Sequence, residues 1–123
     1  MPSKTILIVD DCPDLRELMR FMIESEGYSV ELAENGHEAM EKLRRGFRPS
    51  LILLDMIMPD LDGPSFLAEL VKEMPDVLDH ARIIATSGKD RQPDLDNTFG
   101  FLQKPFDIDT LFSAIEKAHS APH

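Results

Sequence analysis

Residues 6–27 read ILIVDDCPDLRELMRFMIESEG, and the pattern of this stretch sets the fold expected of the whole chain. Its first four residues form an uninterrupted apolar run, which is typical of a strand buried on both faces of a sheet. Pro13 suits the first turn of a helix and Gly27 suits its end, and between them apolar residues recur at helical spacing. The apolar stripe consists of Leu15, Leu18, Met19, Met22 and Ile23, and the solvent-facing side consists of Arg16, Glu17, Arg20 and Glu24. The stretch therefore predicts a buried strand followed by an amphipathic helix.

The same order, a short apolar run and then a helical pattern, recurs along the rest of the chain. Strands are predicted at residues 28–32, 51–54, 83–85 and 99–103. Helices are predicted from Asn35-Gly36 to Gly46, from Gly63 to Pro75, and after Asp107, which suits a helix N-cap. Parallel neighbours need right-handed crossovers that place helices on the sheet. We therefore expect an α/β protein with a doubly wound, five-stranded parallel sheet and helices on both faces.

The segment between the last two predicted strands differs from the other connections. Residues 88–98 contain a single apolar side chain, Leu95, and Pro93 interrupts them. Such a segment has no apolar stripe that could pack on the sheet. We therefore expect a loop, or at most one short turn, where a fourth helix would otherwise cover the sheet.

The length and charge of the chain limit the classes of function. At 123 residues the chain is expected to form one domain, residues 1–123. Its formal net charge of −10 repels nucleic acid phosphates and anionic lipids, so direct binding to nucleic acid or to a membrane is not expected. The apolar run at residues 6–9 is too short for a signal peptide or a membrane span, which favours the cytoplasm.

The single cysteine and the four histidines are not expected to form a site. Cys12 has no partner for an intrachain disulfide, and its acidic neighbours disfavour a thiolate, so we expect a half-buried cysteine without a redox role. The histidines lack the spacing of zinc ligands and are expected to be exposed. They are His37, His80, His119 and His123.

Polar residues follow four of the predicted strands. Asp10-Asp11, Asp55, Ser87 and Lys104 stand at the strand ends. Ligands of such sheets bind outside the carboxyl ends of the strands, so these side chains are expected to meet at that edge, here named the carboxyl edge. Three carboxylates that converge without a cation repel one another, which implies a bound hard cation. Mg²⁺ is the natural candidate, because it takes one or two carboxylates together with water and phosphate oxygens.

The same residues supply the parts for phosphoryl transfer to a carboxylate. An aspartate beside a divalent cation can attack phosphorus and form an acyl phosphate when positive charges neutralise the transferring oxygens. Lys104 supplies a second positive charge, the Ser87 hydroxyl can donate to a phosphoryl oxygen, and Gly88 leaves room for the group. The carboxyl edge is therefore expected to carry a phosphorylation site.

Four motifs at these positions make the chain resemble a known family. They are Val9-Asp10-Asp11, Leu54-Asp55-Met56-Ile57-Met58-Pro59 with Asp62-Gly63, Ser87-Gly88, and Lys104-Pro105-Phe106. Over essentially its whole length the chain resembles the receiver domain of bacterial two-component response regulators, of the stand-alone type to which the chemotaxis response regulator belongs. The resemblance implies a flavodoxin-like sheet with the strand order 2-1-3-4-5.

By this resemblance Asp55 is the phosphoacceptor. Asp10, Asp11 and Asp55 would hold Mg²⁺ together with the main-chain carbonyl of Ile57, and Lys104 would contact the phosphoryl group. The resemblance therefore implies a regulatory domain that accepts and releases a phosphoryl group, and not an enzyme that turns over a separate substrate.

The resemblance also implies a switch and its partners. Ser87 stands where the family places a switch hydroxyl, and Phe101 where it places an aromatic side chain that changes rotamer as that hydroxyl moves. The phosphoryl donor would be a histidine kinase or a histidine phosphotransfer protein in a two-component phosphorelay. Output would pass through contacts with a downstream protein, through a homodimer or through onward phosphotransfer, because no effector domain is expected after the last helix.

Two other classes of function share part of this pattern. A magnesium-dependent phosphohydrolase with an aspartyl nucleophile would use the same cation and acyl phosphate, but it needs a second acid where this chain has Ile57. A flavodoxin-like module that binds a flavin needs a Ser/Thr/Gly-rich phosphate loop after the first strand, whereas residues 10–14, DDCPD, would repel a phosphate. Both alternatives are less consistent with the sequence than a phosphoacceptor switch.

Overall fold

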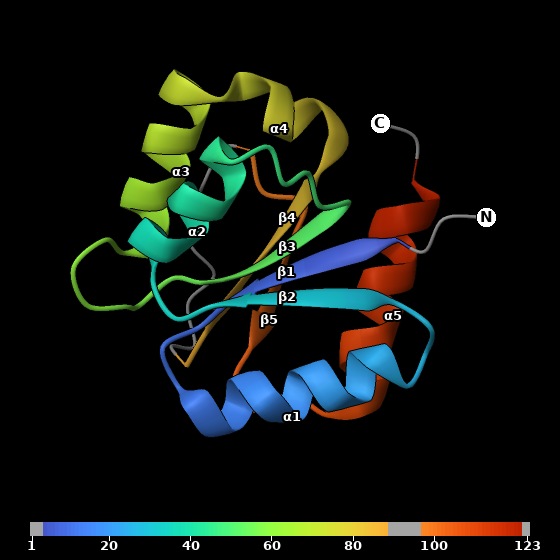
Figure 1. The fold of residues 1–123 in the computed structure, drawn as a ribbon. Helices are drawn as coiled ribbons and strands as arrows, with labels where there is room; N and C mark the ends of the chain where they lie inside the picture. Colours follow the sequence, from blue (N-terminus) through green and yellow to red (C-terminus); the bar gives the residue numbers. More distant parts are fainter. Residues whose placement is uncertain (1–3, 89–96, 122–123) are drawn as a thin grey trace.

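The computed structural model describes residues 4–88 and 97–121 (Figure 1). Within these ranges the chain forms five strands and five helices. The strands are β1 (Thr5–Val9), β2 (Ser29–Ala33), β3 (Leu51–Asp55), β4 (Arg82–Ser87) and β5 (Gly100–Gln103). The helices are α1 (Pro13–Glu24), α2 (Gly36–Arg44), α3 (Gly63–Glu73), α4 (Pro75–His80) and α5 (Ile108–Ser120).

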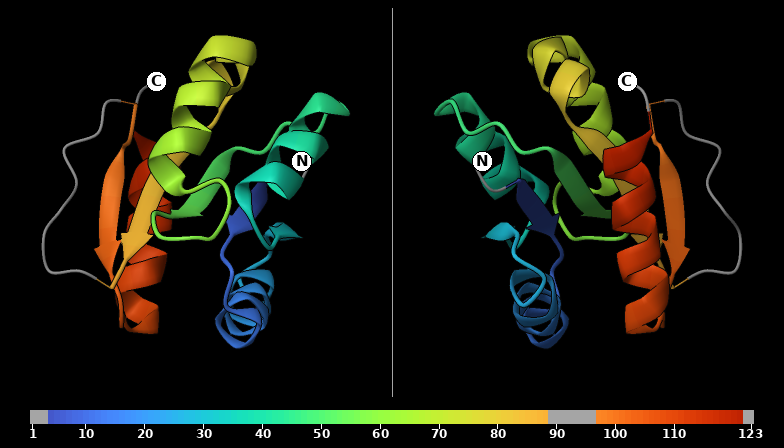
Figure 2. Two further views of the ribbon diagram at one scale, coloured as in Figure 1. Left: turned by 90° about the vertical axis from the view of Figure 1, so that its left-hand side faces the viewer. Right: turned by 90° about the vertical axis from the view of Figure 1, so that its right-hand side faces the viewer.

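The five strands form one parallel sheet in the order β2-β1-β3-β4-β5. Across its centre, Ile8 of β1 pairs with Leu53 of β3, which pairs in turn with Ile84 of β4. The expected doubly wound sheet and its strand order are confirmed. Because all strands point the same way, their carboxyl ends meet at one edge (Figure 2).

Helices cover both faces of the sheet: α2, α3 and α4 lie on one face, and α1 and α5 lie on the other (Figures 1 and 2). Successive side chains of a strand point to opposite faces, so Leu7 and Val9 enter the core under α2 and α3, whereas Ile6 and Ile8 enter the core under α1 and α5. All four are fully buried. Each such side chain stabilises the fold by roughly 1.5–3 kcal/mol, which is why β1 is apolar from Ile6 to Val9.

Three helices begin at acidic or amide side chains that cap their first turn. Asn35, Asp62 and Asp107 each accept a hydrogen bond from a main-chain N–H three residues later, at 2.8, 2.9 and 2.8 Å. Such a cap stabilises a helix by about 1 kcal/mol and fixes where it starts. The helices α2, α3 and α5 therefore begin directly after these residues, where the sequence predicts that they start.

The short helix α4 is absent from the sequence-based prediction, which ends the third helix at Pro75. The structure ends α3 at Glu73 and begins α4 at Pro75 itself. Proline stops the helix before it, but its fixed φ also suits the first position of a new helix. Val77 is fully buried and anchors α4 against the sheet. The loop expected at residues 88–98 falls mostly on residues 89–96, which lie outside the described residues.

Three side chains are placed differently from the prediction. Cys12 is exposed and not half-buried, because it lies where the chain leaves the sheet. His119 is half-buried and not exposed: its Nε2 lies 2.8 Å from the Ser50 Oγ. Leu18, expected in the apolar stripe of α1, is 54% exposed, because the stripe is wider than the part of α1 that the sheet covers.

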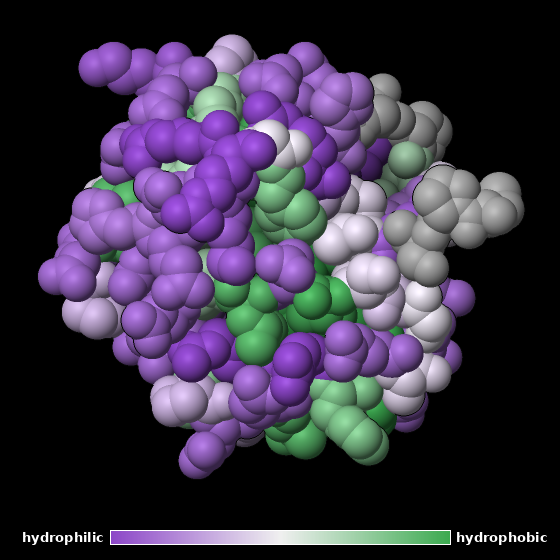
Figure 3. Space-filling model, in the orientation of Figure 1, coloured by the Kyte–Doolittle hydropathy of each residue, from purple (hydrophilic) through white to green (hydrophobic). Residues whose placement is uncertain are grey.

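The visible surface is mainly hydrophilic on the face of Figure 1, in keeping with the net charge of −10 (Figure 3). Apolar side chains show over the edge strand β2 and along α1. On α1 the most exposed large apolar side chain is Phe21, at 74%. Among the described residues, no helix has the length and apolar character that crossing a membrane requires.

Candidate functional site

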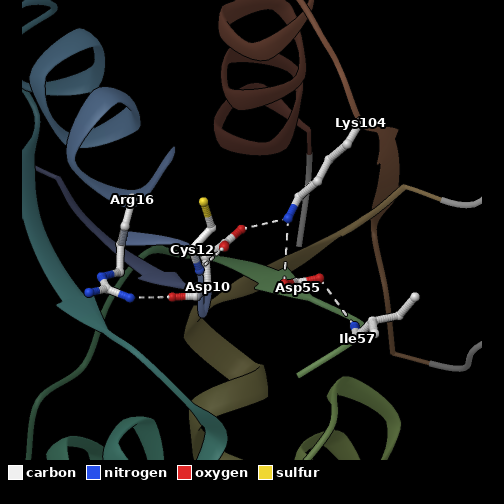
Figure 4. Close-up of polar contacts among 6 residues, drawn as sticks. All are labelled: Asp10, Cys12, Arg16, Asp55, Ile57 and Lys104. Atoms are coloured by element: carbon white, nitrogen blue, oxygen red, sulfur yellow. Dashed lines mark hydrogen bonds and ion pairs between the residues drawn. The ribbon is translucent and has the colours of Figure 1, made fainter. Parts of the chain in front are cut away.

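Three carboxylates and one ammonium group meet at the carboxyl edge of the sheet. Figure 4 shows Asp10, Asp55 and Lys104 of this group. Asp10 and Asp11 directly follow β1, Asp55 ends β3, and Lys104 directly follows β5. β1 and β3 are neighbours in the sheet, so one carboxylate oxygen from each of the three aspartates lies within 4.8 Å of the others. The expected gathering of these four side chains is therefore seen in the structure.

Asp10 is a buried carboxylate with a partner for each oxygen; its side chain is 1% exposed. Its Oδ1 accepts a hydrogen bond from the main-chain N–H of Cys12 at 2.9 Å, and its Oδ2 accepts one from the Lys104 Nζ at 2.8 Å. A buried carboxylate without such partners would be strongly destabilising. Asp10 is thus held in place, whereas the neighbouring Asp11 is exposed and can be reached from solvent.

Asp55 is the central carboxylate of the site and is 4% exposed. Its Oδ1 accepts a hydrogen bond from the main-chain N–H of Ile57 at 3.1 Å. Burial raises the pKa of Asp55 from 3.8 to about 6; the Ile57 N–H and the charge of Lys104 oppose this rise, and the neighbouring Asp10 and Asp11 add to it. Asp55 is therefore a partly desolvated carboxylate in a crowded anionic site, where a further cation would favour its ionised form.

Lys104 bridges the two buried carboxylates. Its Nζ lies 2.8 Å from the Asp10 Oδ2 and 3.5 Å from the Asp55 Oδ2. Burial alone would lower the pKa of Lys104, but the hydrogen bond and charge of Asp10 and the charge of Asp55 raise it above its usual value. Lys104 is therefore a permanent positive charge beside Asp55.

The donor set fits a hard divalent cation. Three carboxylates face one ammonium group, so the site carries excess negative charge. Mg²⁺ and Ca²⁺ prefer carboxylate and carbonyl oxygens, and Mg²⁺ completes its octahedron with water or phosphate oxygens. The exposed Asp11 and the exposed Ile57 leave one side of the cluster open to solvent.

Ser87 and Phe101 lie on β4 and β5, the two strands that follow β3 towards one edge of the sheet. Ser87 is the last residue of β4 and is buried, and its main-chain carbonyl accepts a hydrogen bond from the main-chain N–H of Lys104 at 2.7 Å. Phe101 of β5 pairs with Ala85 of β4 and packs, half-buried, against the core under α2, α3 and α4. By the two-residue alternation of strands, Ser87 and Phe101 share this face of the sheet. Gly88 has no atom within 4 Å of where a Cβ would lie.

Arg16 contacts the site although the helical spacing of residues 13–24 predicts it on the solvent-facing side of α1. Its Nη1 donates a hydrogen bond to the main-chain carbonyl of Asp10 at 2.7 Å (Figure 4). A side chain that reaches back six residues to a main-chain oxygen leaves no periodic signal in a sequence. The one usable signal is a long cationic side chain in the early turns of the helix that follows the acidic pair.

The comparison with protein families agrees with this geometry. The family model described as the response regulator receiver domain matches residues 6–116. The chain belongs to the response regulator receiver domain family.

Relatives of this receiver domain include both short and long proteins. It is 41% identical over 116 residues to an uncharacterized 14.6 kDa protein of Leptolyngbya boryana, and the match covers 91% of this chain and 87% of that protein. It is 36% identical over 124 residues to the transcriptional regulatory protein GlrR of Escherichia coli K12, and the match covers 95% of this chain but 27% of GlrR. The receiver domain thus corresponds to about a quarter of that longer regulator.

A solved structure shares both fold and sequence with this receiver domain. The response regulator TrrA of Thermotoga maritima, crystallised in complex with Mg²⁺-BeF, superposes with a TM-score of 0.80 at 34% identity. The match covers 94% of this chain and 98% of that one. The similarity therefore extends over nearly the whole of both chains.

Proposed function

We propose that this receiver domain, extending over residues 1–123, is a signalling switch controlled by phosphorylation of Asp55. The observation that carries the proposal is the position of Asp55: it is buried at the end of the central strand β3, beside the acidic pair and 3.5 Å from the Lys104 Nζ. Asp10 also lies in the acidic cluster, contacts Lys104 and accepts a hydrogen bond from the next loop, but Asp55 is the member of the cluster that ends the central strand β3.

The reaction proposed is transfer of a phosphoryl group from a phosphohistidine. An Oδ of Asp55 attacks phosphorus and the P–N bond breaks; its electron pair stays on the imidazole nitrogen, which takes a proton from solvent. Such transfers depend on positioning and on neutralising the charge of the transferring oxygens. Lys104, 3.5 Å from Asp55, is placed to take one of these oxygens, and the hydrogen bond from Ile57 holds the other carboxylate oxygen of Asp55.

The proposed cofactor is Mg²⁺. The carboxylates of Asp10, Asp11 and Asp55 fit it, and we propose that the main-chain carbonyl of Ile57 completes the protein ligands. When bound, Mg²⁺ would lower the repulsion between the acidic site and an anionic donor. The complex of the related TrrA with Mg²⁺-BeF supports this choice of cation.

Ser87 and Phe101 are proposed to communicate phosphorylation to the surface. Ser87 ends β4, the neighbour of β3, and its hydroxyl would donate to a phosphoryl oxygen on Asp55. Phe101 lies on the same face of the sheet, half-buried at the edge strand β5, where a change of rotamer would alter the surface. The two side chains are therefore proposed as regulatory and not catalytic.

The proposed phosphoryl donor is a histidine kinase or a histidine phosphotransfer protein in a two-component phosphorelay. The site is open at the carboxyl edge. An apolar hollow of about 490 Å³ lies there, lined by Leu15, Leu18, Lys104 and Phe106. This open apolar surface favours a protein as the donor. With a net charge of −10, the domain is proposed to pass its signal to a protein, to a second copy or onward by phosphotransfer, and not to nucleic acid or a membrane.

Incubation with acetyl phosphate tests the proposal without a partner protein. With Mg²⁺ present, intact-mass measurement should show the gain of one phosphoryl group. Asp55→Asn should gain none, and excess chelator should prevent the gain in the wild type. Phosphorylation that is undiminished by the chelator, or that persists in Asp55→Asn, would contradict the proposal.

A further inference from the structure

The buried aspartate Asp10 has a hydrogen-bond partner for each of its polar atoms. Its main-chain N–H donates to the Ala33 carbonyl at 3.1 Å, and its two carboxylate oxygens accept from the Cys12 N–H and the Lys104 Nζ. The fourth atom, the main-chain carbonyl oxygen, accepts from the Arg16 Nη1 at 2.7 Å (Figure 4). Arg16 therefore completes the fixation of a residue whose own side chain belongs to the proposed metal site.

The bond from Arg16 joins the first helix to the end of the first strand. The main-chain N–H of Arg16 donates to the Cys12 carbonyl at 2.9 Å, as a helix requires, while the half-buried side chain reaches back to Asp10. The pairing of β1 with both neighbouring strands ends at Val9, so within the described ranges no strand supplies a donor to the Asp10 carbonyl. A charged donor on a buried carbonyl is among the stronger hydrogen bonds of a protein.

We propose that Arg16 is a positioning residue for the metal ligands Asp10 and Asp11. The carbonyl that it binds belongs to the peptide group joining these two aspartates, so the bond fixes the plane from which both carboxylates project. The inference rests on the proposed function, because it assigns Arg16 to the magnesium site. Arg16 itself touches neither the cation nor the phosphoryl group.

The charge of Arg16 and its proposed positioning role predict opposite changes in Mg²⁺ affinity when Arg16 is removed. The direction of the change therefore tests the inference. A guanidinium group close to the site repels a divalent cation, so its removal would tighten Mg²⁺ binding if charge were its whole role. If Arg16 positions the ligands, its removal weakens Mg²⁺ binding. Arg20 is a matched control, because it lies one turn further along α1, is exposed and is paired with Glu17 at 2.6 Å.

The experiment compares Mg²⁺ affinity by isothermal titration calorimetry in the wild type, Arg16→Met, Arg16→Lys and Arg20→Met. Loss of a partner that orients a metal ligand weakens metal binding by roughly 10- to 100-fold. Because Arg16 acts through the main chain, we expect the lower end, about tenfold, for Arg16→Met. Arg16→Lys keeps one donor and should lie between Arg16→Met and the wild type. Arg20→Met should match the wild type within about twofold, since exposed ion pairs contribute little.

A second measurement uses the protein without metal. In excess chelator, hydrogen exchange at the Cys12 amide, which donates to Asp10, should be faster in Arg16→Met than in the wild type and unchanged in Arg20→Met. If Arg16→Met fails to fold by circular dichroism, Arg16→Lys is compared with Arg20→Lys in its place.

Each outcome decides one question. Equal or tighter Mg²⁺ binding by a folded Arg16 variant, or unchanged exchange at the Cys12 amide, overturns the positioning role. If the wild type itself binds no Mg²⁺, or if Asp55→Asn and Asp11→Asn bind it as well as the wild type does, the proposed function fails instead. Weaker binding together with faster exchange supports both.

Discussion

Replacement of Lys104 by methionine should raise the pKa of Asp55 further in the metal-free protein. Methionine keeps an unbranched side chain of similar length but removes the charge. In the wild type the Lys104 Nζ lies 3.5 Å from the Asp55 Oδ2 and opposes the burial that raises the pKa of Asp55 to about 6. Without this charge, ionisation of Asp55 becomes less favourable.

The magnitude follows from the distance. Two unit charges separated by 3.5 Å attract by about 1 kcal/mol at the dielectric constant of water and by about 5 kcal/mol at an effective value near 20. The Lys104 and Asp55 side chains are 21% and 5% exposed, so the site lies between these limits. One pKa unit corresponds to about 1.4 kcal/mol, so the pKa of Asp55 should rise by at least about one unit.

Carbon-13 NMR of the aspartate carboxyl groups, titrated from pH 4 to pH 9 in excess chelator, measures this pKa directly. Lys72→Met, which changes an exposed lysine in the last turn of α3, is the control and should leave Asp55 unaffected. An unchanged pKa of Asp55 in a folded Lys104→Met would refute the electrostatic account of the site.

The remaining predictions concern stability. Asp55→Asn should stabilise the metal-free protein at pH 7 by about 3 kcal/mol, because the folded-state pKa of Asp55 is about 6 against 3.8, and wild-type stability is therefore lost as the pH rises through this range. Urea denaturation at several pH values should show the difference opening between pH 4 and pH 7, and a constant difference would contradict the assignment. Burial lowers the pKa of His119 below 6.5, so the folded state favours the neutral imidazole. The contribution of His119 to folding stability is therefore complete above pH 6.5 and is lost as the pH falls below that value. His119→Gln should lack this loss of stability at low pH. Identical profiles of stability against pH for the variant and the wild type would exclude this role of His119. Gly36→Ala should destabilise the protein by about 1–3 kcal/mol, because its Cβ would lie 2.8 Å from the Leu61 carbonyl oxygen. Gly100→Ala is the control and should not destabilise it, because its Cβ would meet open space. Equal melting temperatures for the two variants would disprove this prediction.

The sheet and the main site could be predicted because their signals are local in the sequence. A buried parallel strand must be apolar on both faces, so residues 6–9 and 51–54 stand out as unbroken apolar runs. Parallel strands then bring their ends to one edge, and this places Asp10, Asp55 and Lys104 together although up to 94 residues separate them.

The short helix α4 could not be predicted from the same signals. Pro75 favours both the end of one helix and the start of another, and a helix of six residues is too short to show an apolar period. Burial of Val77 against the sheet favours the helical alternative, and that contact depends on the packing of α3.

Contacts between a side chain and a distant partner were missed for a related reason. Arg16 was expected in solvent because its neighbours at helical spacing are charged, yet its length lets it reach the Asp10 carbonyl. His119 lies next to Ser50 and against the Tyr28 ring, whose centroid is 5.4 Å away. Such contacts depend on which elements meet in space, and residue spacing carries no information about them.

The identity of the phosphorylated residue is tested most directly by reductive trapping. After incubation with acetyl phosphate and Mg²⁺, borohydride converts an aspartyl phosphate into homoserine, and tandem mass spectrometry of the peptides locates it. The account predicts homoserine at position 55 and nowhere else. Homoserine in place of Asp10 or Asp11, or a stable phosphate on Ser87 with Asp55 unchanged, would contradict it.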